Sequence, residues 1–343
     1  MTSVLRTIGL AAVAGLLTVA CGAPAEPEGG EGVRGGEHKT VGLLLTGPAH
    51  DGGFMESGFA GAERAGREFG ADIRVVDGIA PQQPAVEAAL RDLARGGADL
   101  VLAHGGQNVA AAKVVAAEFP ATTFAVTQAD VAGTDLAGYE VLQEQSAWLA
   151  GAAAGLLTRT GTVGHMSGIR PVPGLKGRAA FVDGFAHTKP GGRVLTNFSG
   201  NQDDIALARR IATAELNAGA DYIFTMLNAG RPGVAEAIRT AGKGRQFGNV
   251  RDYTADDPAV FAGSAVADSG LAAFRAIDDF VHGRLHRGET VQIGLETPDA
   301  VRLTLAGDVP EPVRAEVERL RTRIINGEID IRTTYDGPEF TAP

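Results

Sequence analysis

The sequence predicts an α/β protein with two doubly wound, parallel-sheet lobes, and three observations lead to this fold class. Short apolar segments alternate with helical stretches of about 12 residues, a pattern typical of a parallel sheet covered on both faces. The pattern then starts again, with equivalent landmarks separated by 122 residues. The length of 343 residues, with 44% hydrophobic side chains, is enough to build two hydrophobic cores.

The first copy of the pattern begins at Thr40. Each expected strand is a short apolar run that ends in glycine or a polar residue, and each is followed by an alanine-rich or leucine-rich helical stretch. The expected strands lie at 40–47, 71–78, 99–106 and 122–128, and the expected helices at about 56–69, 85–97 and 108–119.

The second copy begins at 162–168, where the sequence TVGHMSG resembles TVGLLLTG at 40–47. Further strands are expected at 193–200 and 221–227, with helical stretches before and between them. Three pairs of landmarks share the offset of 122: Val41 with Val163, Phe59 with Phe181, and Asp99 with Asp221. A shared offset across strand, helix and strand indicates two copies of one unit, and a general similarity of all strand–helix units is the alternative.

The first 21 residues have the organisation of a bacterial lipoprotein signal. Arg6 precedes an apolar run over 8–20 that is too short to span a bilayer and is typical of a signal peptide. The sequence LTVAC at 17–21 resembles a lipobox, although a threonine stands where an aliphatic residue is more usual. We therefore expect residues 1–20 to be removed and Cys21 to carry lipid chains that anchor the protein to a membrane.

Residues 21–39 are expected to form a flexible tether, because they are rich in Gly, Pro and Glu and show no apolar periodicity. Loss of the signal peptide, with one arginine and no acidic residue, changes the net charge from −10 to −11. This acidic balance argues against a nucleic-acid-binding role. The single cysteine excludes intramolecular disulfides and cysteine-rich zinc or iron–sulfur sites, and we expect no metal or cofactor.

Two doubly wound lobes in one chain place a cleft between them. Ligands of such sheets bind beyond the carboxyl ends of the parallel strands, so the residues just after each strand are the candidates for the cleft lining. In the first lobe these are 46–54, 77–78, 104–107 and 127–128, and in the second lobe they are 167–170, 198–201, 224–231 and 251–252.

The glycine-rich loop at 47–54 follows the first strand and matches no phosphate-binding motif. Asp51 in this loop has two interpretations, since its carboxylate can cap the next helix or face a ligand. Phe54 likewise either packs beneath the loop or offers an aromatic face to the cleft. The loop is therefore a candidate for either a structural or a ligand-binding role.

Phe224 closes a strand of the second lobe, where the alternation of side chains places it on the same face as Tyr222. A core position is the default interpretation of that pattern. If the lobes close on each other, however, Phe54 and Phe224 approach from opposite sides and sandwich a flat ligand, with about 1–3 kcal/mol from each stacked face.

Polar residues follow two further strands of the second lobe. Asn228 and Arg231 lie after one strand, and Asp252 follows another, where its carboxylate can accept hydrogen bonds from two hydroxyls of a ribose or sugar. A salt bridge with Arg251, or a helix cap, is the alternative for Asp252. The sequence contains no recognisable catalytic motif and no acid–base pair at a familiar spacing, so we expect binding rather than catalysis.

From about Val41 to Ile331 the chain resembles the basic membrane protein family, the purine-nucleoside-receptor-like lipoproteins that serve ABC importers. The resemblance implies a type I periplasmic-binding fold, in which two α/β lobes close on a small ligand around a three-stranded hinge. The stretches that carry it are DGGF at 51–54, EQSAWLAGAAAGLLTRTGTVGHMSG at 144–168, NAGRPGV at 228–234, FGNVRDY at 247–253 and VRAEVERLRTRIINGEIDI at 313–331.

The resemblance also implies a domain layout. We expect the first lobe to contain 40–143 and about 268–285, and the second lobe to contain 144–267 and about 286–331. Residues 332–343 are expected to form a C-terminal tail.

Transferred motif by motif, the resemblance assigns the base-stacking aromatics to Phe54 and Phe224 and the ribose-binding aspartate to Asp252. The aspartate that the family has in its first loop matches Asp51. The implied ligand-binding set, together with the residues singled out above, is Asp51, Phe54, Gln128, Phe224, Asn228, Arg231 and Asp252.

Three positions depart from the family pattern. Met55 stands where asparagine is frequent, Gln128 where an aspartate commonly ends the strand, and Ala267 where a lysine is frequent. The amide of Gln128 still offers a donor and an acceptor, which together can pair with a purine edge. A different nucleoside, a base or a sugar therefore stays open as the ligand.

The sequence thus predicts a monomeric, lipid-anchored bacterial receptor on the extracytoplasmic side of the cell membrane, which delivers a nucleoside, above all a purine nucleoside, to an ABC permease. A sugar or autoinducer-type receptor of the same fold is the alternative. A nucleoside-processing enzyme would need an acid–base pair that the sequence does not offer. A transcription regulator would need a DNA-binding segment before Val41, where the chain is acidic and rich in glycine.

Overall fold

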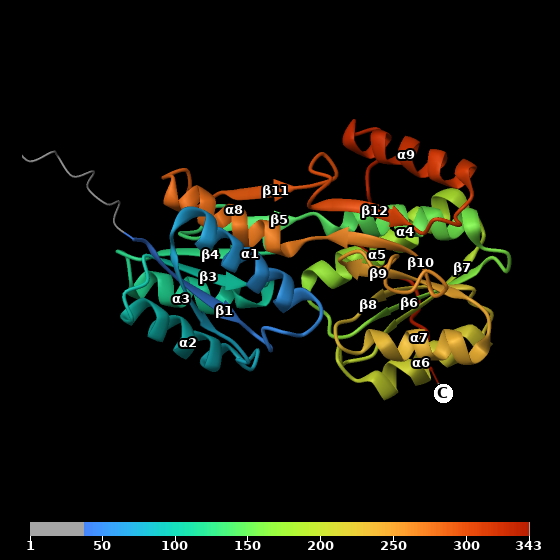
Figure 1. The fold of residues 1–343 in the computed structure, drawn as a ribbon, viewed down its shortest axis with the longest axis horizontal. Helices are drawn as coiled ribbons and strands as arrows, with labels where there is room; N and C mark the ends of the chain where they lie inside the picture. The colour runs from blue at the N-terminus through green and yellow to red at the C-terminus, as the bar shows by residue number, and fades with distance from the viewer. Residues whose placement is uncertain (1–37, 343) are drawn as a thin grey trace, which may run out of the picture. The chain divides into compact units, whose positions relative to one another are not determined.

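Two sheets dominate residues 38–342, the part of the chain that the computed structural model describes (Figure 1). The expectations for residues 1–37, which include the signal peptide and Cys21, lie outside the described residues. Within 38–342, no helix combines the length and the apolar character needed to cross a membrane.

The first sheet has the strand order β11-β5-β4-β3-β1-β2, and every neighbouring pair is parallel. The inner strand β1, between β3 and the edge strand β2, is almost entirely buried, as expected for a sheet that is covered on both faces. The strands are β1 (Thr40–Leu45), β2 (Asp72–Val76), β3 (Leu100–His104), β4 (Thr123–Thr127), β5 (Ala137–Val141) and β11 (Thr290–Ile293).

The second sheet repeats this topology in the order β12-β10-β9-β8-β6-β7. All its neighbouring pairs are parallel except β10 with β12. The strands are β6 (Thr162–Ser167), β7 (Arg193–Phe198), β8 (Tyr222–Met226), β9 (Arg245–Val250), β10 (Phe261–Ala267) and β12 (Val301–Leu305). The predicted fold class is confirmed.

Helices cover both faces of each sheet (Figure 1). On the first sheet α1 packs with α8 on one face and α2 with α3 on the other. On the second sheet α4 packs with α5, and α6 with α7. The helices are α1 (Phe54–Phe69), α2 (Gln83–Arg95), α3 (Val109–Glu118), α4 (Gln143–Leu157), α5 (Val172–Thr188), α6 (Ile205–Asn217), α7 (Arg231–Ala241), α8 (Ser269–Val281), α9 (Glu311–Ile325) and the short 3₁₀ helix η1 (Gly106–Asn108).

The offset of 122 residues corresponds to a shared structural role. Asp99, just before β3, accepts a hydrogen bond from the backbone N–H of Thr40 at 2.8 Å and so ties the start of β1 to β3. Asp221, just before β8, accepts hydrogen bonds from the backbone N–H groups of Arg159 and Thr160, which lead into β6. The repeated aspartate therefore fixes the chain at the amino end of the corresponding strand in each lobe.

Within 38–342, three segments connect the lobes: the β5–α4 junction, the β10–α8 junction, and residues 294–300 between β11 and β12. The third connection differs from the expected layout. Residues 286–331 were expected in the second lobe, but β11 within this segment pairs with β5 of the first sheet. The reason is that the edge of β5 offers unpaired backbone groups, which the short strand β11 satisfies regardless of its side chains.

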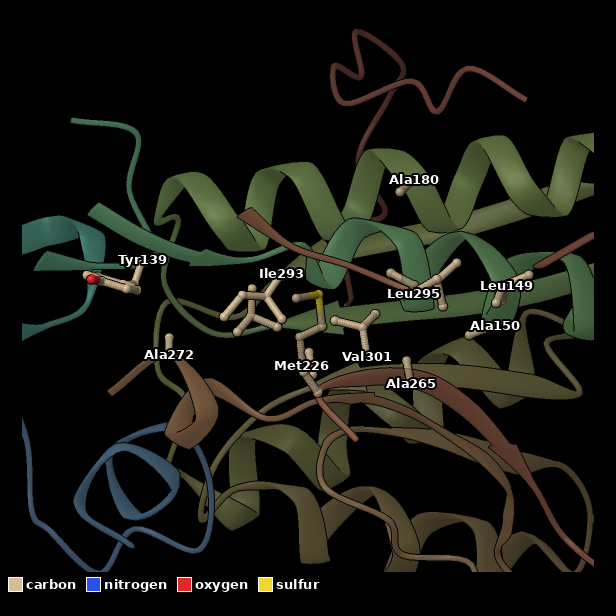
Figure 2. Close-up of a cluster of buried hydrophobic side chains, with 14 of the residues drawn as sticks. Tyr139, Leu149, Ala150, Ala180, Met226, Ala265, Ala272, Ile293, Leu295 and Val301 are labelled. Carbon is tan, nitrogen blue, oxygen red and sulfur yellow. The ribbon is translucent and has the colours of Figure 1, made fainter. Parts of the chain in front are cut away.

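A continuous apolar core runs through the junction of the lobes (Figure 2). Tyr139 and Ile293 enter it from the first sheet, and Met226, Ala265 and Val301 enter it from the second. This packing fixes the strand ends of both sheets close to the connecting segments, and so determines which side chains can meet between the lobes.

Candidate ligand-binding cleft

A cavity of about 90 Å³ lies between the two lobes, and the carboxyl ends of strands from both sheets surround it. Phe54, Gln107 and Gln128 line it from the first lobe, and Asn228 and Asn249 are among its lining residues from the second. This is the position at which doubly wound sheets bind their ligands. The sequence-based expectation that residues after the strands form the lining is met here.

The lining is uncharged, and its polar groups lie among apolar side chains. Within residues 38–342, the cavity wall contains no Asp, Glu, Lys, Arg or His side chain. Six carboxamide side chains supply most of its polarity, and each amide offers donors and an acceptor together. They are Gln107, Gln128, Gln143, Gln202, Asn228 and Asn249.

Two of the six amides have no hydrogen-bond partner among the described residues. Gln143, the first residue of α4, is 9% exposed, and Asn249, near the end of β9, is 8% exposed. Buried amides are ordinarily hydrogen-bonded, because an unpaired polar group away from water costs free energy. Gln143 and Asn249 therefore present free donors and acceptors to whatever occupies the cavity.

The other amides are already engaged with the protein. The Gln107 Nε2 donates to Thr46 Oγ1. The Gln128 Oε1 accepts from the backbone N–H of Val141 at 2.7 Å, and its Nε2 donates to the Val141 carbonyl at 3.3 Å. The predicted pairing of Gln128 with a purine edge is therefore not available in this conformation, because β5 lies beside β4 and occupies both ends of the amide.

Two lining residues adopt strained backbone conformations. Gln128 has φ of 59° and Val250 has φ of 74°, and within 38–342 they are the non-glycine residues with positive φ. A left-handed conformation is unfavourable for a β-branched residue such as valine. Strain of this kind is concentrated at functional sites, and here one strained residue comes from each lobe at the end of its strand.

Phe54 lines the cavity and rests on a buried histidine. Its ring stacks on His104, with the ring centroids 4.2 Å apart and the planes 24° from parallel. Burial lowers the pKa of His104 to about 4, so the imidazole is neutral at physiological pH. Its Nδ1 is 2.9 Å from Thr127 Oγ1 and its Nε2 is 3.0 Å from the Phe54 carbonyl, which fixes the ring beneath Phe54.

Phe224 does not face the cavity, and the predicted sandwich of Phe54 and Phe224 is wrong for this structure. Its side chain is fully buried and stacks on Phe181, with centroids 5.0 Å apart. Alternation along β8 places Tyr222, Phe224 and Met226 on one face, but only Met226 lies far enough toward the carboxyl end to reach the cavity. The default core interpretation of Phe224 was the correct one.

Asp51 caps α1 and holds the lobes together instead of lining the cavity. Its carboxylate accepts hydrogen bonds from the backbone N–H groups of Gly53, Met55 and Glu56. It also accepts from Asn228 Nδ2 of the second lobe at 2.9 Å. Nearby, Tyr253 Oη of the second lobe donates to the Gly52 carbonyl at 3.2 Å, so direct contacts join the lobes at this point.

Arg231 and Asp252 also lie away from the cavity. Arg231 begins α7, donates to the Leu227 carbonyl, and places its guanidinium 4.0 Å from the centroid of the Tyr253 ring. Asp252 lines a separate hollow of about 410 Å³ and accepts hydrogen bonds from Thr254. Its role as a ribose ligand is not supported by this placement, because Asp252 does not line the cavity and its Oδ1 already accepts both hydrogen bonds from Thr254.

Sequence reasoning missed Gln143, Gln202 and Asn249 as lining residues, whereas Met226 lies inside the predicted strand-end range 224–231. Asn249 was inside a stretch that carried the family resemblance, and Gln202 lies one residue beyond a strand-end range. Gln143 follows β5, a strand that the apolar pattern did not reveal. In the described part of the chain, no three His, Cys, Asp or Glu residues are grouped as a metal site.

Comparisons with known proteins agree with this architecture. Residues 38–334 match the family described as ABC transporter substrate-binding protein PnrA-like. Basic membrane protein A of Borreliella burgdorferi is 24% identical over 323 residues, covering 90% of this chain and 92% of that protein.

Two solved structures have the same fold. A solute-binding protein of an ABC transporter system from Aeropyrum pernix K1 is 21% identical with a TM-score of 0.75, covering 87% of this chain and 94% of that one. A solute-binding protein of an ABC transporter system from Conexibacter woesei is 24% identical with a TM-score of 0.68, covering 87% of this chain and all of that one. The two repeated lobes, the cleft between them and the match over 38–334 lead to one conclusion: this chain belongs to the PnrA-like family of ABC transporter substrate-binding proteins.

Proposed function

We propose that this substrate-binding protein is a lipid-anchored receptor for a nucleoside, above all a purine nucleoside, which it holds in the inter-lobe cavity and delivers to an ABC permease. The family and the similar structures are solute-binding proteins rather than enzymes, so the proposed role is binding without chemistry. The ligand is released unchanged to the permease.

The observation that carries the proposal is an uncharged cavity with two free, nearly buried amides and one aromatic side chain. A nucleoside is neutral, has a flat base that can stack on Phe54, and carries donors and acceptors that can pair with the amides of Gln143 and Asn249. A phosphate, carboxylate or ammonium group would lose its hydration on entering the cavity and would find no opposite charge there. The cavity therefore favours a neutral, polar ligand.

The cavity is smaller than the usual range of ligand pockets, which is about 300–1,000 Å³. The contacts of Asp51 with Asn228 and of Gly52 with Tyr253 hold the lobes together beside it. We infer that the lobes separate around the three connecting segments to admit a nucleoside and close upon it. A ligand favours the closed form only through contacts that it does not make in the open form.

A pentose is the second candidate, and the small cavity favours it. Amide groups pair with sugar hydroxyls as readily as with a base, and an aromatic ring can cover the apolar face of a sugar. The two candidates differ in what Phe54 contributes, because a base stacks on the ring over a larger area.

A thermal-shift panel with adenosine, guanosine, inosine, their free bases, ribose and arabinose tests the proposal. At least one nucleoside should raise the melting temperature, since a ligand that binds only the folded state stabilises it by mass action. Phe54→Ala should lower the affinity for that nucleoside about 30-fold, because stacking of the base on one aromatic face contributes about 2 kcal/mol of binding free energy.

Phe69→Ala is the matched control, because Phe69 packs on Phe274 at the far end of α1 and does not line the cavity. It should lower the melting temperature of the free protein and leave the ligand-induced shift unchanged. If only the pentoses raised the melting temperature, the proposed nucleoside would be wrong and a pentose would be the ligand.

The proposed lipid anchor rests on the sequence at 17–21 and has its own test. In cells that process lipoproteins, the wild-type protein should sediment with membranes, and Cys21→Ser should move it to the soluble fraction. Two or more acyl chains make membrane attachment stable, so the change should be nearly complete. Retention of the serine variant on membranes would contradict the anchor.

A further inference from the structure

The C-terminal segment 332–342 lies along the second lobe and forms specific contacts with it. The backbone N–H of Phe340 donates to the Thr196 carbonyl of β7 at 2.7 Å, and Asn197 Nδ2 donates to the Phe340 carbonyl at 2.9 Å. The strand β7 is at the edge of its sheet, so the segment satisfies backbone and side-chain groups that the sheet leaves free.

Glu339 of this segment binds two arginines of the second lobe. Its carboxylate accepts two hydrogen bonds from Arg170, at 2.8 and 2.5 Å, and one from Arg178 at 3.0 Å. Both guanidinium groups also lie over the ring of Phe198, at 4.5 and 5.0 Å from its centroid. A bidentate arginine–carboxylate pair fixes both groups in direction as well as in distance.

The two arginines differ in their surroundings. The Arg178 side chain is almost completely buried and also lies 4.5 Å from the ring centroid of Tyr335, another residue of the C-terminal segment. The Arg170 side chain is half exposed, and Glu339 is its sole hydrogen-bond partner in the described part of the chain. Arg178 therefore anchors Glu339, and Glu339 in turn holds Arg170.

Arg170 belongs to the loop that forms the rim of the ligand cavity. Its neighbours in the chain, Ile169 and Pro171, both line the cavity, and α5 starts directly after them. Ile169 is 46% exposed, so packing alone gives this loop little support on its outer side. The backbone is tied on either side of Arg170, since the Gly168 carbonyl accepts from the Gly200 N–H and the Pro171 carbonyl accepts from the Leu175 N–H. Arg170 itself is held through its side chain, by Glu339.

We propose that Glu339 is a positioning residue for the ligand cleft: through its paired hydrogen bonds to Arg170, the C-terminal segment holds the rim loop 169–171 in its binding conformation. The part of this inference that concerns affinity rests on the proposed nucleoside function, whereas the part that concerns loop order does not. A loop that is already ordered loses less entropy when the ligand binds, and so binds more tightly.

The experiment combines amide hydrogen exchange of the free protein with titration of the nucleoside that gives the largest thermal shift. Arg170→Gln is the primary variant, because it removes the link to the rim loop and leaves the Glu339–Arg178 pair in place. Exchange should accelerate at 169–172, and the nucleoside should bind about tenfold more weakly, mainly through faster release. Glu339→Gln should show the same exchange pattern and also loosen 335–341.

Glu328→Gln is the matched control. Glu328 pairs with Arg323 at the exposed end of α9, so the same substitution removes a surface ion pair away from the cavity. Exchange at 169–172 and nucleoside affinity should both equal those of the wild type. Arg170→Lys should restore part of the protection, because an ammonium can still donate to Glu339, although not in the bidentate geometry.

Unchanged exchange at 169–172 in Arg170→Gln would overturn the inference, whatever the ligand is. Equal affinity in the presence of faster exchange would also overturn it, since the loop would then have no part in binding. If the wild type binds no nucleoside in the panel, the proposed function fails, and the exchange data alone decide whether Glu339 orders the rim loop.

Discussion

Replacing Asn249 by leucine is expected to weaken nucleoside binding about 30- to 100-fold without destabilising the protein. Its amide lines the cavity, is nearly buried, and has no hydrogen-bond partner among residues 38–342. A ligand group that loses its partner in a closed cleft costs about 2.0–2.7 kcal/mol of binding free energy, which corresponds to this loss of affinity.

The effect on stability should have the opposite sign. The Asn249 amide makes no hydrogen bond to the described residues, so a leucine of similar size loses none in the ligand-free protein and adds apolar side-chain atoms to a nearly buried position. We therefore expect the free energy of unfolding of Asn249→Leu to equal or exceed that of the wild type. Calorimetric titration gives the affinity, and denaturant unfolding followed by the fluorescence of the single tryptophan, Trp148, gives the stability.

Asn217→Leu is the control for this substitution, because Asn217 lies at the exposed end of α6, away from the cavity. It should leave affinity unchanged. If Asn249→Leu bound nucleoside as tightly as the wild type, the free amide would have no role in binding. If Asn249→Leu lost both affinity and free energy of unfolding, Asn249 would instead have a structural role.

Lys176→Met is expected to destabilise the folded protein by about 3 kcal/mol. Lys176, on α5 of the second lobe, donates to Glu140 on β5 of the first lobe at 2.6 Å and lies 3.6 Å from Glu144. Glu140 is nearly buried, and Lys176 is its hydrogen-bond partner. Removing one member of a buried ion pair leaves an uncompensated charge, which is much more costly than replacing both members.

The loss should depend on pH in a defined direction. Burial raises the pKa of Glu144 above its ordinary value, and the attraction of Lys176 opposes that rise. Without Lys176 this opposing attraction is lost, so the folded-state pKa of Glu144 rises further. A raised carboxyl pKa destabilises the protein at high pH and ceases to do so once the group is protonated, so the loss should be larger at pH 8 than at pH 5.

Two further variants separate the ion pair from a general effect of losing a lysine. Lys113→Met, at an exposed position of α3, should leave the free energy of unfolding unchanged. Adding Glu140→Gln to Lys176→Met should recover much of the stability, because it removes the unpaired charge. A loss that is independent of pH and is not recovered by Glu140→Gln would contradict the role assigned to the pair.

The fold was accessible from the sequence because its signals are local and repeated. Apolar runs and helical stretches follow from side-chain periodicity, and the offset between Asp99 and Asp221 corresponds to hydrogen bonds that hold the chain at the start of β1 and just before β6. The strand β11 was assigned to the wrong lobe because pairing with β5 is a non-local backbone interaction. Its side chains carry little information about which edge it joins.

Only the general position of the site could be predicted from the sequence. Strand ends can be located from sequence, and they do surround the cavity. Which side chain reaches the cavity depends on where the strand stops, and the buried Phe224 is only two positions before the lining residue Met226. Likewise, the sequence cannot show that Val141 occupies the amide of Gln128 while the amides of Gln143 and Asn249 stay free.

An uncharged cleft between the lobes should bind a neutral nucleoside in preference to a charged derivative of it. Calorimetric titration of the wild-type protein with the best nucleoside of the panel and with its 5′-monophosphate tests this most directly. We expect the nucleoside to bind and the monophosphate to bind at least about 100-fold more weakly, because the phosphate finds no counter-charge in the cavity and loses its hydration. Equal or tighter binding of the monophosphate would show that the cleft does not select a neutral ligand.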